Sequence, residues 1–122
     1  HSRGFPNAFF FGPAQSGFTA TYTYSLDEQS VHLAHILGKA RERGANRIEA
    51  SERAETEWVK TIVEKARLTA DFQEKCTPGY YNNEGNVNTK PQNNTYGGGP
   101  IEFFGLMEKW REQGNLDGLE LT

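Results

Sequence analysis

Residues 5–29 form the part of the sequence best suited to hold a ligand, and they read FPNAFFFGPAQSGFTATYTYSLDEQ. We expect a short apolar strand over residues 8–11, a turn that starts at Gly12-Pro13 and contains Gly17, and then an amphipathic helix. This arrangement presents backbone N–H groups and a helix N-terminus, which can hold the anionic or polar edge of a cofactor. The alternative interpretation is an ordinary strand-to-helix connection.

A second candidate is the Tyr80-Tyr81 pair, which lies in a polar stretch over residues 77–99 that is rich in Asn and Gly. Long loops without regular structure are often functional or disordered. Adjacent aromatic side chains on such a loop can fold over a ligand ring or a ribose. They can equally hold the loop against the rest of the molecule.

Other reactive side chains carry weaker signals. His32 and His35 are three residues apart on the expected first helix, but a metal site needs further ligands. Cys76 is the single cysteine, and Glu28 is interpreted as a solvated carboxylate. We expect no metal site and assign no catalytic residue, because the spacing contains no Ser-His-Asp set, phosphate-binding loop or paired catalytic carboxylates.

Besides the strand at residues 8–11, three helices and two short extended segments are expected to position these residues. The first helix begins near residues 22–25, ends at Gly44 and buries a stripe at helical spacing, made of Leu26, Leu33, Ile36, Leu37 and Ala40. A brief extended segment follows at residues 47–50. Ser51 then caps a second helix that ends near Phe72 and buries Ala54, Trp58, Ile62 and Ala66.

The third helix follows Pro100 and ends at Gly114. Its expected buried face carries Phe103, Met107 and Trp110, with Ile101 and Phe104 beside it. Leu119 and Leu121 alternate as in a final strand.

Composition excludes several classes of function. The chain has 122 residues, a net charge of −3 and only 35% hydrophobic residues, with a mean hydropathy of −0.75 and a pI near 5.6. Nucleic acid is not an expected partner, because phosphate binding needs clustered Lys and Arg. No run approaches the ~18 apolar residues of a membrane span. We expect a cytoplasmic protein with a marginal fold that needs a partner surface.

Six pieces of the sequence resemble the Baeyer–Villiger monooxygenases, in the order that family has them. They are GFPNAFFFGPAQSGFT from residue 4, Glu28-Gln29, AETEWV from residue 54, PGYYNNEGN from residue 78, Lys90-Pro91 and YGGG from residue 96. The sequence PGYYNNEG around Tyr80 and Tyr81 is similar to that of family members that act on large cyclic ketones or steroids.

The resemblance implies a fold and a reaction. Residues 1–44 would be the closing strand, turn and helix of an α/β, Rossmann-like FAD-binding domain. Residues 45–122 would be a mainly helical C-terminal extension with a long mobile loop at 77–99. The enzyme would use FAD, NADPH and O2 to insert an oxygen atom next to a ketone carbonyl, giving an ester or lactone, and the cofactor would supply the oxygen chemistry.

The resemblance also implies roles for individual residues. The FAD-binding set would be Gly12, Pro13, Tyr22, Thr23 and Tyr24, with the helix N-terminus stabilising negative charge on the flavin ring. The pocket for a cyclic ketone substrate would be shaped by Gly17, Phe18, Thr19 and Ala20. In the loop that closes over NADP, Tyr80 stands where many members have Trp, and Lys90 would complete the cofactor-binding set.

Several parts of the family pattern are missing from the sequence. Both dinucleotide-binding GxGxxG motifs, the FxGxxxHxxxW fingerprint and the family's catalytic Arg and Asp are absent. We therefore expect a C-terminal fragment that is inactive alone and packs on the remainder of the FAD and NADP domains. The exposed first strand is expected to pair with another copy or pack abnormally in isolation. The alternative is a free-standing module that binds a protein or ligand without redox chemistry.

Overall fold

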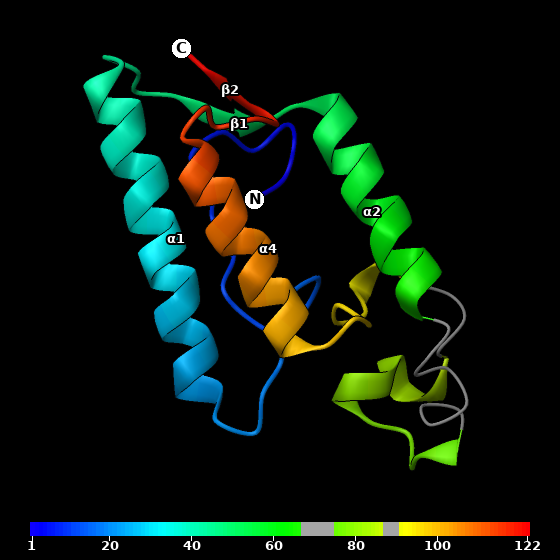
Figure 1. Cartoon of the computed structure of the whole chain (residues 1–122). Helices are drawn as coiled ribbons and strands as arrows, with labels where there is room; N and C mark the ends of the chain where they lie inside the picture. Colours follow the sequence, from blue (N-terminus) through cyan, green and yellow to red (C-terminus); the bar gives the residue numbers. More distant parts are fainter. Residues whose placement is uncertain (67–74, 87–90) are drawn as a thin grey trace.

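The computed structural model describes residues 1–66, 75–86 and 91–122, which are built mainly from three helices (Figure 1). The elements in chain order are α1 (Tyr22–Glu42), β1 (Ile48–Ala50), α2 (Glu52–Ala66), η1 (Tyr80–Gly85), η2 (Pro91–Asn93), α4 (Pro100–Gln113) and β2 (Leu119–Leu121), where η denotes a 3₁₀ helix. The structure therefore combines helices with a small sheet. The expected Rossmann-like portion stays a prediction.

The sheet consists of β1 and β2, which pair in antiparallel register with Glu49 opposite Glu120. It lies at one end of the three helices, near both chain termini (Figure 1). The two extended segments expected at residues 47–50 and 119–121 are thus confirmed, although the sequence did not indicate that they pair with each other.

The predicted strand at residues 8–11 is wrong for this chain, since no described residue pairs with it as a strand. The preceding residue, Asn7, binds the sheet: its N–H donates to the Ile48 carbonyl at 2.9 Å, and its side-chain oxygen accepts from the Ile48 N–H at 2.9 Å. Within the segment, Phe9 packs against the hydrophobic cluster that contains Ile48. Asn7 has a φ of +59°, a value that turns the chain away from the strand edge. Phe10 and Phe11 are exposed.

α1 begins and ends where the sequence predicts, and Gly44 follows it with a φ of +69°. Its buried side is formed by Ser25, Ile36 and Ala40. Two details of the prediction are wrong: Leu37 is 47% exposed, and the fully buried Ser25 was not expected. Leu37 faces solvent because the residues packed on α1 cover the side that carries Ile36 and Ala40.

α2 and α4 also follow the sequence. The Ala54 N–H donates to Ser51 Oγ at 3.2 Å, which confirms Ser51 as the cap of α2. The predicted end of this helix near Phe72 lies outside the described residues. α4 has Pro100 at its first position and ends at Gly114 with a left-handed φ of +65°. Ile101, placed beside its buried face, is 88% exposed.

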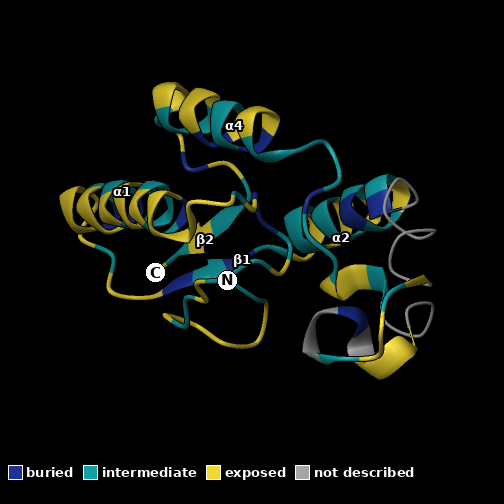
Figure 2. Ribbon diagram, turned by 90° about the horizontal axis from the view of Figure 1, so that it is seen from below, coloured by how far each residue is buried: buried dark blue, intermediate teal, exposed yellow. Residues whose placement is uncertain are grey.

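The hydrophobic core is divided into two small clusters. One joins Ile36, Ala40, Ile48 and Leu116, and the other joins Ile62, Tyr96, Phe103 and Met107. Large parts of α1 and α4 are exposed (Figure 2). Ten large apolar side chains in the described part of the chain are exposed as well, among them Phe18, Val31 and Leu106. Such an exposed apolar surface is typical of a face that binds another part of a protein.

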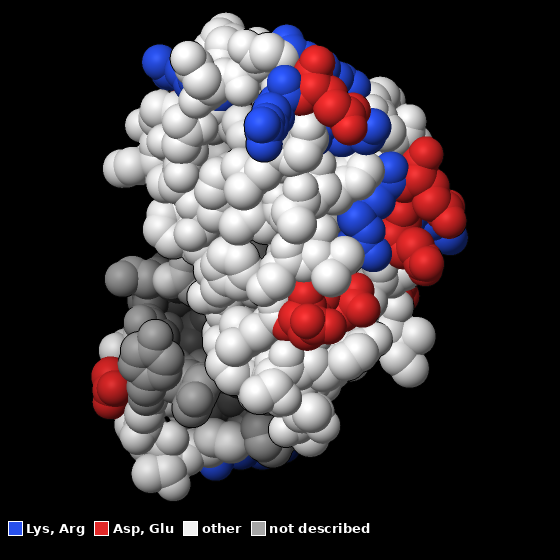
Figure 3. Space-filling view, turned by 90° about the vertical axis from the view of Figure 1, so that its left-hand side faces the viewer, with Lys and Arg blue, Asp and Glu red and all other residues white. Residues whose placement is uncertain are grey.

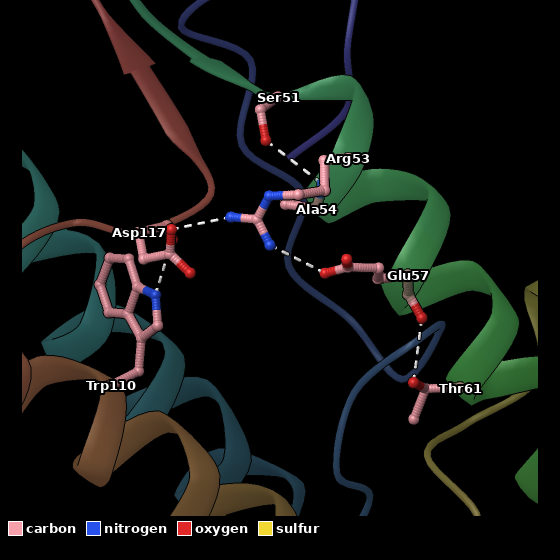
Figure 4. Close-up of polar contacts among 7 residues, drawn as sticks. All are labelled: Ser51, Arg53, Ala54, Glu57, Thr61, Trp110 and Asp117. Carbon is pink, nitrogen blue, oxygen red and sulfur yellow. Dashed lines mark hydrogen bonds and ion pairs between the residues drawn. The ribbon is translucent and has the colours of Figure 1, made fainter.

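Polar contacts join α2 to the turn between α4 and β2 (Figure 4). Arg53 lies 2.8 Å from the Asp117 carboxylate and 2.9 Å from that of Glu57. The Trp110 indole N–H donates to the Asp117 carbonyl at 2.9 Å. These contacts hold the ends of α2 and α4 together beside the sheet.

Candidate functional site

The turn over residues 12–17 is held to α1 by Gln29. The Gly12 N–H donates to Gln29 Oε1 at 3.2 Å, and Gln29 Nε2 lies 3.2 Å from both the Gly12 carbonyl and Ser16 Oγ. Ser16 Oγ also donates to the Gly12 carbonyl. One side-chain amide therefore closes the turn at both ends. The sequence indicated Gln29 only as half of the Glu28-Gln29 motif. Its hydrogen bonds to the turn were not predicted.

The two glycines of this turn have different requirements. Gly12 has a φ of +149°, a conformation that side chains strongly disfavour. Gly17 is buried, and a Cβ there would lie 2.8 Å from Cδ1 of Phe103 on α4. Gly17 thus allows the turn to approach α4 closely. Pro13, between them, is half-buried.

The predicted ketone-pocket residues Gly17, Phe18, Thr19 and Ala20 form a rim, in which Phe18 and Ala20 are exposed and Thr19 is half-buried. Phe18 is 48% exposed, and its ring centroid lies 6.2 Å from that of Tyr22. Thr19 Oγ1 donates to the Thr21 carbonyl at 2.7 Å and lies 3.3 Å from Ser25 Oγ. Ala20 is exposed. Thr19 therefore fixes the path of the rim into α1, while Phe18 and Ala20 face outward.

The N-terminus of α1 is open to a ligand. Its N-cap, Thr21, makes no side-chain capping bond, and the first turn contains no acidic residue. Tyr22, Thr23 and Tyr24 are all exposed. An uncapped helix start without a competing carboxylate favours negative charge nearby. The Tyr24 ring packs edge-on against Phe104 of α4 at 5.4 Å, which holds this end of α1 against α4.

A partly open groove of about 500 Å³ lies between α1 and α4 beside this rim. Two predicted site residues, Thr19 and Tyr24, line it together with Glu28, Phe104 and Arg111. A larger cavity of about 610 Å³ is lined by α1, α2, α4 and the N-terminal segment, and of the predicted site residues that the structure describes it includes only Gly12. The groove is therefore the cavity that lies with the predicted pocket residues.

Two predicted cofactor residues cannot be placed in full. Tyr80 begins η1, and Lys90 lies outside the described residues. The start of η1 is shaped by Asn82, which is buried. Its Oδ1 accepts from the Gly79 N–H at 2.8 Å, and its Nδ2 donates to the Thr77 carbonyl at 3.1 Å.

The structure brings the turn 12–17 next to the end of the stretch 77–99. The Gln15 N–H donates to the Asn94 carbonyl at 2.8 Å, and the Tyr96 N–H donates to the Ser16 carbonyl at 3.0 Å. Gln15 Nε2 donates to the Gln92 carbonyl at 2.8 Å. These bonds connect residues about 80 positions apart, and no short-range sequence pattern could have indicated them.

The two helix histidines lie against Trp110, with ring-centroid distances of 4.9 Å for His32 and 6.3 Å for His35. Burial, together with the nearby charges of Arg111 and His35, lowers the pKa of His32 to about 4. Glu28 is less solvated than expected, since it is half-buried and lies 3.9 Å from Arg111. Within the described ranges no three His, Cys, Asp or Glu side chains are grouped to hold a metal ion.

On the face shown in Figure 3, Lys and Arg lie next to Asp and Glu at the top and on the right-hand side. A separate acidic group lies near the middle without basic neighbours, and much of the face carries no charge. Among the described residues, no helix is both long and apolar enough to cross a membrane.

Comparison with known proteins shows which enzymes contain a segment similar to this chain. The chain is 49% identical to pentalenolactone D synthase of Streptomyces exfoliatus over 97% of its length, and 40% identical to a Baeyer–Villiger monooxygenase of Streptomyces coelicolor over 92%. The polycyclic ketone monooxygenase of Thermothelomyces thermophila superposes with a TM-score of 0.87 over 99% of the chain, at 28% identity. The chain is homologous to a segment of the Baeyer–Villiger monooxygenases.

The match covers only part of each relative. The chain spans 20% of the S. exfoliatus synthase, 18% of the S. coelicolor enzyme and 20% of the fungal structure. No family model matches the chain. The resemblance seen in the sequence motifs is confirmed, and the roles of the individual site residues stay predictions.

Proposed function

We propose that this chain is the C-terminal segment of a Baeyer–Villiger monooxygenase that uses FAD, NADPH and O2 to insert an oxygen atom next to a ketone carbonyl. The observation that carries the proposal is the match of nearly the whole chain, in both sequence and structure, to segments of such enzymes. A ketone substrate is supported by the names of two relatives, a ketocytochalasin monooxygenase and the polycyclic ketone monooxygenase. The segment alone would be inactive.

The N-terminus of α1 fits an FAD ring edge. The helix start has no capping side chain and no acidic residue in its first turn, so it favours an electron-rich ligand. Gly12 and Pro13 in the turn, with Tyr22, Thr23 and Tyr24 at the helix start, would hold this edge of the cofactor. Bound FAD would supply the oxygen-transfer chemistry, and the chain would orient it and exclude water.

The rim formed by Gly17, Phe18, Thr19 and Ala20 would shape the ketone pocket. Phe18 is an exposed aromatic side chain beside the uncapped helix start, so it is placed to form an apolar wall for a cyclic ketone. Thr19 would fix the rim through its bond to the Thr21 carbonyl. None of these residues would take part in proton transfer.

NADPH would bind at the stretch 77–99. Tyr80 and Lys90 are its proposed contacts in this chain. The remaining FAD and NADP domains would cover the exposed apolar residues described above, with residues 1–44 completing the FAD domain and residues 45–122 forming the helical extension.

The proposal is tested by purifying the full-length protein that contains this segment. We expect a yellow protein with a flavin absorbance spectrum, which oxidises NADPH faster when a cyclic ketone is added. A short, colourless, monomeric protein that binds no flavin would instead support a free-standing binding module.

A further inference from the structure

The turn that precedes the proposed ketone rim is fixed by residues outside its own element. Gln15 and Ser16 bind Gln92, Asn94 and Tyr96 through the three hydrogen bonds given above, and we refer to these five residues as the Gln15 cluster. The rim, which begins at Gly17, follows Ser16 directly in the sequence. The conformation of the rim therefore depends on where the segment 92–96 lies.

Gln15 has a backbone conformation that requires support. Its φ is +57°, in the left-handed region that residues other than Gly, Asn and Asp seldom adopt. Such conformations persist when surrounding contacts impose them, and they concentrate at functional sites. In this turn, two hydrogen bonds from Gln15 itself supply that constraint, one from its N–H and one from its side chain.

The other half of the cluster is firmly anchored. Tyr96 is 4% exposed and stacks on Trp58 of α2 with an interplanar angle of 7° and a centroid distance of 5.6 Å. Its hydroxyl donates to Glu102 of α4, whose carboxylate also lies 3.1 Å from Lys65 Nζ. The Tyr96 N–H that binds Ser16 is thus part of a residue held by both α2 and α4.

Two glycines allow this anchoring. A Cβ at Gly97 would lie 2.2 Å from the Lys65 carbonyl oxygen, and a Cβ at Gly98 would lie 2.6 Å from the Tyr96 ring. Side chains at these positions would displace Tyr96 from its packed position. Gly97 and Gly98 therefore allow Tyr96 to pack closely on α2 and α4. This packing fixes the segment 92–96, which binds Gln15.

We propose that Gln15 is a positioning residue for the ketone pocket, acting through the turn it fixes and not by touching the substrate. Its side-chain bond to the Gln92 carbonyl sets the start of the rim formed by Gly17, Phe18, Thr19 and Ala20. This inference rests on the proposed function, because it assigns Gln15 a role in the pocket of that enzyme.

The test compares substitutions at Gln15 in the full-length enzyme. Gln15→Ala removes the side-chain donor, and Gln15→Glu keeps the length but replaces the donor with a carboxylate. Gln15→Gly also removes the donor but relieves the backbone strain, so it keeps the test valid if the alanine variant folds poorly. Gln113→Ala, at the exposed end of α4, is the matched control.

We expect each Gln15 variant to raise KM for a cyclic ketone about three- to tenfold, the range that the loss of one hydrogen bond gives. KM for NADPH and the rate of NADPH oxidation without ketone should stay within twofold of wild type, as should every parameter of Gln113→Ala. Hydrogen–deuterium exchange should be faster at the Tyr96 amide, whose acceptor is the Ser16 carbonyl.

Three other results would overturn the inference. One is a ketone KM within twofold of wild type in both Gln15→Ala and Gln15→Gly, while the wild-type enzyme oxidises ketones. Another is a parallel change in the parameters for ketone and NADPH, which would indicate a general loss of structure. A wild-type enzyme with no ketone-dependent NADPH oxidation would overturn the proposed function itself, and this inference with it.

Discussion

Gly17 lets the turn over residues 12–17 pack closely on α4, so we predict that Gly17→Ala destabilises the chain. The added methyl would meet Phe103 at 2.8 Å, and forcing such a contact costs about 1–3 kcal/mol. Gly105→Ala is the matched control. It places the same methyl inside α4, where nothing lies within 4 Å, and should stabilise by up to about 1 kcal/mol. Urea unfolding of both variants checks the pair, and equal effects would contradict this packing.

His32 gives the chain an acid-sensitive residue. Its pKa falls from 6.5 to about 4, mainly because it is buried. Between these two values the unfolded chain binds a proton at His32 that the folded chain does not, so the free energy of unfolding decreases as the pH falls through that window. Below about pH 4 this residue should cause no further loss.

The measurement is urea unfolding at pH 7 and pH 5 for the wild type and for His32→Gln. The variant, which cannot titrate at this position, should lose less stability between the two pH values. A His32 ring that titrates near 6.5 by NMR, or equal losses in both proteins, would show that the ring is not held in its neutral form.

At the scale of elements, the start of α2 depends on one hydroxyl. We predict that Ser51→Ala lowers the free energy of unfolding by about 1 kcal/mol, because it removes the capping bond to the Ala54 N–H. Ser30→Ala is the control, since Ser30 Oγ donates to the Leu26 carbonyl within α1 and caps no helix. Alanine there should be neutral or slightly stabilising. Equal destabilisation by both variants would contradict the capping role.

Both limits of α1 and α4 and the start of α2 could be predicted because they rest on local chemistry. Ser51, Pro100, Gly44 and Gly114 act within one turn of the helices they cap or end, and the sequence shows them directly. The prediction of a strand at residues 8–11 was wrong because a strand depends on contacts with a distant part of the chain. A strand exists only with a neighbour to pair with, and the apolar pattern carries no information about that neighbour.

In the candidate site, too, the features set by local sequence could be predicted and those set by long-range contacts could not. Gly12, Gly17 and the open start of α1 were predicted from residue types that turns and helix ends require. The roles of Gln15, Gln29 and Tyr96 could not be predicted, since each depends on a contact with another element. Glu28 was expected to be solvated for the same reason, because its partner Arg111 lies on α4.

At the scale of the whole molecule, the described part of the chain exposes many large apolar side chains. Phe10 is 69% exposed and Ile101 is 88% exposed, and the core is split into two small clusters. We predict that the isolated 122-residue chain self-associates and enhances the fluorescence of an apolar dye, while the full-length enzyme does neither. Pairing of residues 8–11 with a second copy is one route to this association.

Analytical ultracentrifugation with dye binding separates the two outcomes. A double substitution of Phe10 and Ile101 by Ser should reduce the association, whereas Thr56→Ser on the exposed side of α2 should not. If the isolated chain is monomeric and binds no dye, this result would contradict the proposal that its exposed apolar residues bind the rest of an enzyme.

The central claim is that this chain is one wall of a site that inserts an oxygen atom from O2 into a ketone. The most direct measurement is mass spectrometry of the product formed by the full-length enzyme from a cyclic ketone, NADPH and ¹⁸O₂. The claim predicts an ester or lactone carrying one ¹⁸O atom, with the second atom of O2 released as water and one NADPH oxidised per product. A ketone recovered unchanged while NADPH is consumed, or a product whose added oxygen comes from water, would contradict it.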